Sequence, residues 1–377
     1  SMANVVDVTP AVLAWAISES GYSTETVAER VGVASEVVGQ WERGVEKPTV
    51  GQFRSLVQLL KRPSATFFLP KPPPPDGARL EFRQSREATR GELVPAERQA
   101  LRDARRLQLA VATIRADLGD PPPDLPRIRV GSNPERAAHA VRKWLEFGVD
   151  EQLACRSASE CLASWRRTLE KRGILVFALP LGSDGIRGFS VWDEMAPQVG
   201  YSTAWNVGAR MFTLIHELGH LVTRTDSACL DPHALSGVAV ERWCDRFAAA
   251  VLMPFARFRK EAWALGGGKL IEDVTVLAQL AQRFRTSLSA TALRLVELGL
   301  ADRSLFDGLP AGRDDKSRGG APGAGRTRVE IRRDEYGHAT LQAFVRAVAR
   351  DALPRSEVIR YLDISDSNLD DIEQLVA

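Results

Sequence analysis

The sequence FTLIHELGHL (residues 212–221) carries two histidines four positions apart, His216 and His220. Positions i and i+4 lie on the same face of a helix, so both imidazoles can reach one metal ion. Glu217 directly follows the first histidine, which directs its carboxylate beside the metal rather than at it. There it can accept a proton from a water that the metal acidifies. The apolar residues around this HExxH pattern predict a buried helix.

A metal site that acts on water usually has three protein ligands and one open position, so a third ligand is needed. His233 and Glu241 are the nearest candidates along the chain. Glu241 begins a helical stretch 21 residues beyond the second histidine, a spacing that permits a turn and an antiparallel return helix. Asp245 lies one turn further on the same face, where it can accept the free N–H of a ligand histidine. The helical position of Cys244 directs it away from Glu241.

The segment from Arg210 to Pro254 resembles the ImmA/IrrE metallopeptidases. It contains RMFTLIHELGHL followed by ERWCDRFAAAVLMP, and that family typically shows RxFTxxHExGH followed by ExxANxFAxxLLMP. The resemblance implies an α+β, gluzincin-like peptidase domain with one Zn²⁺ per chain and Glu217 as the catalytic base. The zinc ligands that it implies are His216, His220 and Glu241. Manganese or iron is also compatible with two histidines and one carboxylate.

Three short β-type runs precede the HExxH helix, at residues 173–179, 188–192 and 198–201, and they predict a small sheet. Hydrolysis of a peptide bond also needs a donor for the tetrahedral oxyanion. Tyr201, or a backbone N–H of the strand at 198–203, is a candidate. The same strand is a candidate for holding a substrate by edge pairing.

Residues 9–69 carry apolar side chains at helical spacing and predict a compact set of helices. The stretch QWERGVEKPT (residues 40–49) resembles the XRE/Cro-type repressors, whose usual signature is xWExGxxxPS/T. In that family the second helix of a helix–turn–helix reads the major groove. The DNA-contacting residues that the resemblance implies are Ser35, Glu36, Gln40 and Arg43. Trp41 and Leu60 are expected in the core.

The charge of this leading region is not that of a strongly cationic DNA-binding surface. Residues 1–75 hold seven basic and seven acidic residues. Glu25 stands where such repressors often have a phosphate-contacting glutamine, and a carboxylate next to phosphate is unfavourable. Two interpretations therefore remain open: sequence-specific DNA binding, with a possible homodimer, and a helical module for dimerisation or partner capture.

The composition excludes several classes of protein. No apolar run approaches the roughly 18–20 residues that span a bilayer, and the first twenty residues lack the basic stretch and cleavage site of a signal peptide. The formal net charge of +2 argues against a polycationic nucleic-acid coat. Four cysteines, none in a CxxC spacing, predict reduced thiols. The expected location is the cytoplasm, without membrane contact.

Four consecutive prolines at 72–75 mark the clearest domain boundary, because such a run forms a stiff spacer. The fold class expected is a mainly α multidomain protein, with an all-α helix–turn–helix domain, an α+β metallopeptidase domain and a helical C-terminal region. The boundaries expected in chain order are 1–70 (XRE-type helix–turn–helix), 71–90 (Pro-rich linker), 91–126 (linker helix), 127–306 (ImmA/IrrE-like zinc peptidase domain with a helical extension), 307–327 (flexible linker) and 328–377 (C-terminal helical region). The last part is expected to begin with a short β-type stretch before two amphipathic helices.

Two functions follow from these resemblances. The first is a zinc-dependent endopeptidase fused to a DNA-binding domain, which regulates transcription or a stress or mobile-element response by cleaving a repressor, a partner or itself. The second is a transcriptional regulator or an antitoxin of a toxin–antitoxin pair, whose zinc domain mainly binds the partner toxin. An intact Glu217 favours the enzyme, because this carboxylate is not needed to hold the metal. The expected partners are a protein substrate or toxin and a DNA operator.

Overall fold

The computed structural model describes residues 4–73, 81–84, 94–181, 186–225, 236–310 and 325–376. The chain divides into two compact units, the first formed by residues 1–77 and 89–103 and the second by residues 78–88 and 104–377. Helix α5 (Pro95–Asp117) passes from the first unit into the second. None of the described helices is long and apolar enough to cross a membrane.

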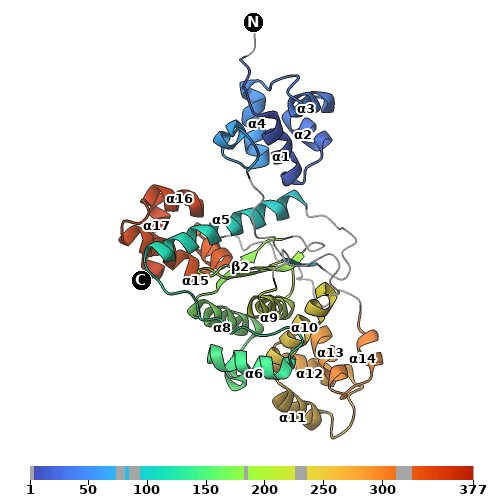
Figure 1. Ribbon diagram of the computed structural model, residues 1–377. Helices are drawn as coiled ribbons and strands as arrows, with labels where there is room; N and C mark the ends of the chain where they lie inside the picture. The colour runs from blue at the N-terminus through green and yellow to red at the C-terminus, as the bar shows by residue number, and fades with distance from the viewer. Residues whose placement is uncertain are drawn as a thin grey trace. The chain divides into compact units, whose positions relative to one another are not determined.

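The first unit is a bundle of short helices, visible in the blue part of Figure 1. Its elements are α1 (Pro10–Ser20), α2 (Thr24–Val31), α3 (Ser35–Glu42), α4 (Val50–Leu60) and the 3₁₀ helix η1 (Ser64–Phe68). Gly32 ends α2 in the left-handed region at φ 81°, which lets the chain turn directly into α3. Trp41 and Leu60 are fully buried in this bundle, which confirms their predicted place in the core.

The second unit is built around a four-stranded sheet with the order β1-β3-β4-β2. Its strands are β1 (Glu81–Gln84), β2 (Leu175–Leu179), β3 (Ile186–Val191) and β4 (Gln198–Ser202). Strands β2 and β4 are parallel, and the other two pairs are antiparallel. The three β-type runs expected from the sequence are therefore confirmed as β2, β3 and β4.

Helices cover the sheet on both sides. The part of α5 that belongs to the second unit lies on one side, where Gln108 donates to the carbonyls of Val191 and Ala196 at 3.0 and 2.8 Å. Helices α8 (Ala158–Lys171) and α9 (Val207–Thr223) lie on the other side (Figure 1). Every residue of β2 and β4 is consequently buried.

The remaining helices of this unit extend the α9 side and form the C-terminal region. They are α6 (Pro134–Leu145), α7 (Val149–Ala154), α10 (Ser236–Leu252), α11 (Phe255–Leu265), α12 (Val274–Phe284), α13 (Leu288–Glu297), α14 (Arg303–Asp307), α15 (Arg328–Ala349), α16 (Arg355–Leu362) and α17 (Asp366–Val376). Helix α15 packs against β2, with the rings of Tyr336 and Phe177 5.3 Å apart.

Two expectations about the connecting segments are wrong. Residues 81–84, inside the predicted linker at 71–90, form strand β1, because β3 offers them a free edge for antiparallel pairing. The C-terminal region has three helices and begins without a strand, because Thr327 and Glu330 form a capping box that starts α15 directly. Most of the predicted linker at 307–327, residues 311–324, lies outside the described residues.

Candidate metal centre

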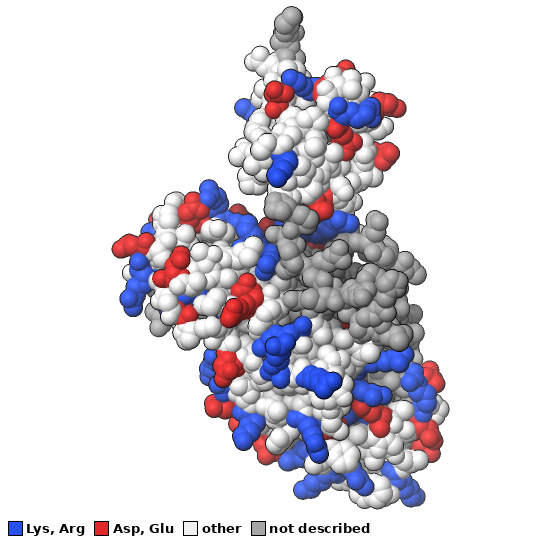
Figure 2. Space-filling model, viewed as in Figure 1, with Lys and Arg blue, Asp and Glu red and all other residues white. Residues whose placement is uncertain are grey.

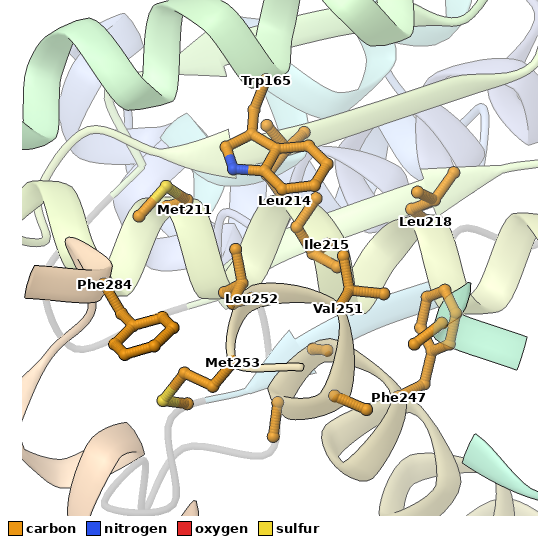
Figure 3. Packing of buried hydrophobic residues seen from close by; sticks show 14 of the residues in the cluster. Trp165, Met211, Leu214, Ile215, Leu218, Phe247, Val251, Leu252, Met253 and Phe284 are labelled. Carbon is orange, nitrogen blue, oxygen red and sulfur yellow. The ribbon is translucent and has the colours of Figure 1, made fainter. Parts of the chain in front are cut away.

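Helix α9 carries the HExxH sequence and is buried on nearly all sides. Asn206 caps its start by accepting from the Ala209 N–H at 2.8 Å. Leu214, Ile215 and Leu218 pack toward Trp165 of α8 and toward the end of α10 (Figure 3). The apolar face thus anchors the helix in the core, and the histidines lie on another of its faces.

Helix α10 returns alongside α9, and Gly219 allows the two helices to approach closely. A Cβ atom at Gly219 would lie 3.1 Å from both Cys244 Sγ and Phe247 Cδ1. This contact places the first half of α10 beside the two histidines. It also accounts for Cys244, which is fully buried between the helices, where burial raises the pKa of its thiol.

His216, His220 and Glu241 meet at one point. The two Nε2 atoms are 3.2 Å apart, Glu241 Oε2 lies 3.2 Å from His216 Nε2, and Glu241 Oε1 lies 3.2 Å from His220 Nε2. The three side chains form a group that can hold a metal ion. Burial opposes ionisation of Glu241, but the hydrogen bonds and charges of the two histidines outweigh it and lower the pKa of the carboxyl.

The spacing of these atoms fits a zinc ion. Tetrahedral zinc with bonds of about 2.0–2.1 Å places its ligand atoms about 3.3–3.4 Å apart, close to the 3.2 Å observed for all three pairs. The Nδ1 of each histidine is engaged elsewhere, which leaves its Nε2 available to a metal ion. Two imidazole nitrogens and a carboxylate that meet at one point can bind a cation.

Two side chains hold the histidine rings from behind. Asp245 Oδ1 lies 3.0 Å from His216 Nδ1, and Thr225 Oγ1 lies 3.1 Å from His220 Nδ1. Sequence reasoning placed Asp245 in this supporting position but did not consider Thr225. Thr225 is brought there by Arg224, which ends α9 in the left-handed region and turns the chain back toward His220.

Glu217 lies beside the ligand cluster and faces the sheet. It is 1% exposed, and a Cβ at Gly188 of β3 would lie 3.0 Å from its Oε1. Burial raises the pKa of Glu217, and the neighbouring His220 and His216 oppose this rise, as does the Ser190 hydroxyl. A carboxylate with a raised pKa, beside a metal site and outside its ligand set, is suited to accept and return a proton.

The comparisons with known proteins agree with this geometry. Residues 169–296 match the family model Peptidase_M78, the IrrE N-terminal-like domain. This part of the chain is therefore similar to the IrrE N-terminal-like domain. This match covers 128 of the 377 residues, from the last turn of α8 to the last turn of α13, and includes all three members of the metal cluster. No curated protein matches the chain.

Tyr201 of β4 is buried at 3% exposure and lies opposite Gly188 of β3, where an added Cβ would lie 3.0 Å from Glu217 Oε1. Its side chain also lies near Arg210 of α9. Its role as the oxyanion donor stays a prediction. Edge pairing of a substrate with this strand is wrong, because β4 is paired on both edges, with β3 and with β2.

The other expected site residues belong to the first unit or lie outside the described residues. His233, the alternative third ligand, lies outside the described residues. The residues expected to contact DNA lie on α3 and at its end: Glu36 and Arg43 are exposed, and Ser35 and Gln40 are half-buried.

We expect Asp245→Ala to weaken zinc binding by about 10–100-fold, because loss of the carboxylate frees the His216 ring to rotate and removes the acceptor for its Nδ1–H. Asp245→Asn, which keeps an acceptor oxygen at the same place, is the matched control and should bind zinc more tightly than the alanine variant. Competition with a fluorescent chelator measures both affinities. Equal affinities for wild type and Asp245→Ala would contradict the supporting role.

Proposed function

We propose that this protein is a zinc-dependent endopeptidase joined to a DNA-binding domain, and that it regulates transcription or a stress or mobile-element response by cleaving one specific protein. The observation that carries the catalytic part is the cluster of His216, His220 and Glu241 with the buried Glu217 beside it. The first three side chains hold the ion, and the fourth is not needed for that purpose.

The roles of the residues follow from their positions. A zinc ion held by the cluster supplies Lewis acidity toward a carbonyl oxygen and lowers the pKa of a water. Glu217 accepts a proton on a carboxylate oxygen and delivers it to the leaving amine nitrogen. Gly188 leaves room for that carboxylate beneath β3, because an added Cβ there would lie 3.0 Å from Glu217 Oε1. Asp245 and Thr225 keep the histidine rings oriented.

The substrate is found by comparing the wild-type protein with Glu217→Gln. Each zinc-loaded protein is incubated with a bacterial proteome, and new protein N-termini are identified by mass spectrometry. We expect one or a few cleavage sites that appear with wild type and are absent with Glu217→Gln. Identical sets of termini from both proteins would refute the peptidase and favour the alternative, a regulator or antitoxin whose zinc domain binds a partner toxin.

The DNA-binding part of the proposal rests on the arrangement of α2 and α3 around Gly32 and on the exposed end of α3. Acidic and basic side chains are interspersed on the visible face of this bundle (Figure 2), in keeping with the balance of seven basic and seven acidic residues over 1–75. Binding should therefore depend on a few well-placed contacts rather than on a broad basic surface.

We expect Arg43→Ala to weaken binding to the selected DNA sequence by about tenfold or more, the loss typical of one good contact to a base. Arg54→Ala is the matched control, because it removes the same charge from an exposed position of α4. DNA sites are first selected from random duplexes with the wild-type protein, and affinities are compared at one salt concentration. Equal losses in both variants would show a purely electrostatic attraction.

A further inference from the structure

Strand β1 pairs with the outer edge of β3. It runs antiparallel to β3, with Glu81 opposite Ser190 and Arg83 opposite Gly188. The other edge of β3 is paired with β4. The four residues of β1 therefore take the place that an extended polypeptide would need in order to pair with this strand.

Gly188 and Ser190 of β3 lie next to Glu217, the expected catalytic base. A Cβ at Gly188 would lie 3.0 Å from Glu217 Oε1. The Ser190 hydroxyl lies near the Glu217 carboxyl and opposes the rise of its pKa. Paired strands lie about 4.7–4.9 Å apart, so the backbone of β1 runs one strand spacing away from the part of β3 that covers Glu217. Backbone pairing with β3 thus places residues 81–83 next to the centre.

We propose that β1 is an intramolecular stand-in for a peptide ligand, which occupies the β3 edge beside Glu217 and keeps this edge closed until another extended chain displaces it. The consequence for catalysis rests on the proposed peptidase function, whereas the occupancy itself rests on the strand pairing. The occupant is a named segment of this chain, residues 81–84, which follows the proline run at 72–75.

The register favours an inhibitor over a substrate. Between Arg83 and Gln84 the pairing shifts, because Gln84 lies opposite Ile186 and Arg187 is left over as an extra residue of β3. Such a bulge bends β3 and interrupts the ladder between β3 and β1. The interruption comes directly after the pair that contains Gly188, so regular pairing between β1 and β3 ends beside Glu217. With only four residues, β1 is also short enough for an incoming chain to replace it.

The first test uses proline, which cannot donate to a ladder. The N–H groups of adjacent strand residues point to opposite sides, so only one of Phe82→Pro and Arg83→Pro removes a hydrogen bond to β3, and the other is its matched control. Both are made in the full-length, zinc-loaded protein and assayed with an internally quenched library of mixed-sequence peptides. One variant should cleave about three- to tenfold faster than wild type, the factor that one lost hydrogen bond allows.

The second test measures binding without cleavage. A fluorescent peptide with the sequence of residues 78–88 is titrated into two full-length proteins. The first is Glu217→Gln combined with the proline substitution that activates cleavage; if neither proline variant cleaves, it carries both substitutions. The second is Glu217→Gln alone. Anisotropy should show tighter binding to the proline-containing protein, and a peptide with proline in place of Phe82 and Arg83 should bind weakly to both.

The two tests separate this inference from the proposed function. If no form cleaves any peptide but the labelled peptide binds only when β1 is disrupted, the peptidase fails and the occupancy stands. If all forms cleave equally and the peptide binds none of them, the occupancy is wrong and the peptidase stands. Cleavage of the wild-type chain between residues 81 and 84 would overturn the inhibitory role, because β1 would then be a substrate.

Discussion

Glu217→Gln should lower the rate of peptide cleavage by about 10²–10⁴-fold and leave one zinc bound per chain. The amide that replaces the carboxylate has nearly the same size but cannot accept a proton at neutral pH. The ligand atoms come from His216, His220 and Glu241, and the side chain of Glu217 is not among them. The fold and the metal content should therefore be unchanged, and only the proton transfer is lost.

Two measurements on the same preparation check this prediction. Elemental analysis gives the zinc content, and cleavage of the peptide library gives the rate. Ser190→Ala is a graded control, because it removes the hydroxyl near the carboxylate and leaves the carboxylate itself; its rate should fall far less. A Glu217→Gln protein that cleaves at the wild-type rate would show that the base has been assigned to the wrong residue.

Gly188→Ala should destabilise the second unit by about 1–3 kcal/mol, the range for an overpacked core. The new Cβ would lie 2.4 Å from Thr213 Cγ2, 2.8 Å from the Gly200 carbonyl oxygen and 3.0 Å from Glu217 Oε1. The backbone oxygen cannot move without breaking the β3–β4 pairing, so helix α9 has to shift away from the sheet. Cleavage should fall sharply with stability, because the shift displaces Glu217.

Gly51→Ala is the control for this substitution. A Cβ at Gly51 meets nothing within 4 Å, and the residue lies in α4 of the first unit. Alanine there should stabilise the helix by about 0.5–1 kcal/mol and leave cleavage unchanged. Urea unfolding and the peptide assay measure both variants. If Gly188→Ala were as stable and active as wild type, the close contact between β3 and α9 would be wrong.

The part of the centre that lies on α9 could be predicted from the sequence because helical spacing alone brings His216 and His220 to one face. Spacing left His233 and Glu241 both open as the third ligand, and the choice of Glu241 came from the family resemblance. Thr225 could not be found in this way. Its position depends on a left-handed turn at Arg224 that returns the chain to His220.

For the sheet, the sequence predicts three of the single strands but not their order. The runs that became β2, β3 and β4 are apolar and bounded by glycine or proline, so each could be predicted by itself. Their order in the sheet is a tertiary property, and it places Tyr201 on an inner strand where no substrate can pair. Strand β1 follows a proline run and has no apolar pattern of its own. It forms because β3 offers an unpaired edge.

The most direct test of the whole account is the zinc content of the purified protein, measured by elemental mass spectrometry for wild type and His216→Ala side by side. We expect about one zinc per chain in wild type and a loss of that zinc in the variant, because His216 supplies one of three ligand atoms. Stoichiometric zinc in His216→Ala, or no zinc in either protein after zinc has been added back, would contradict it.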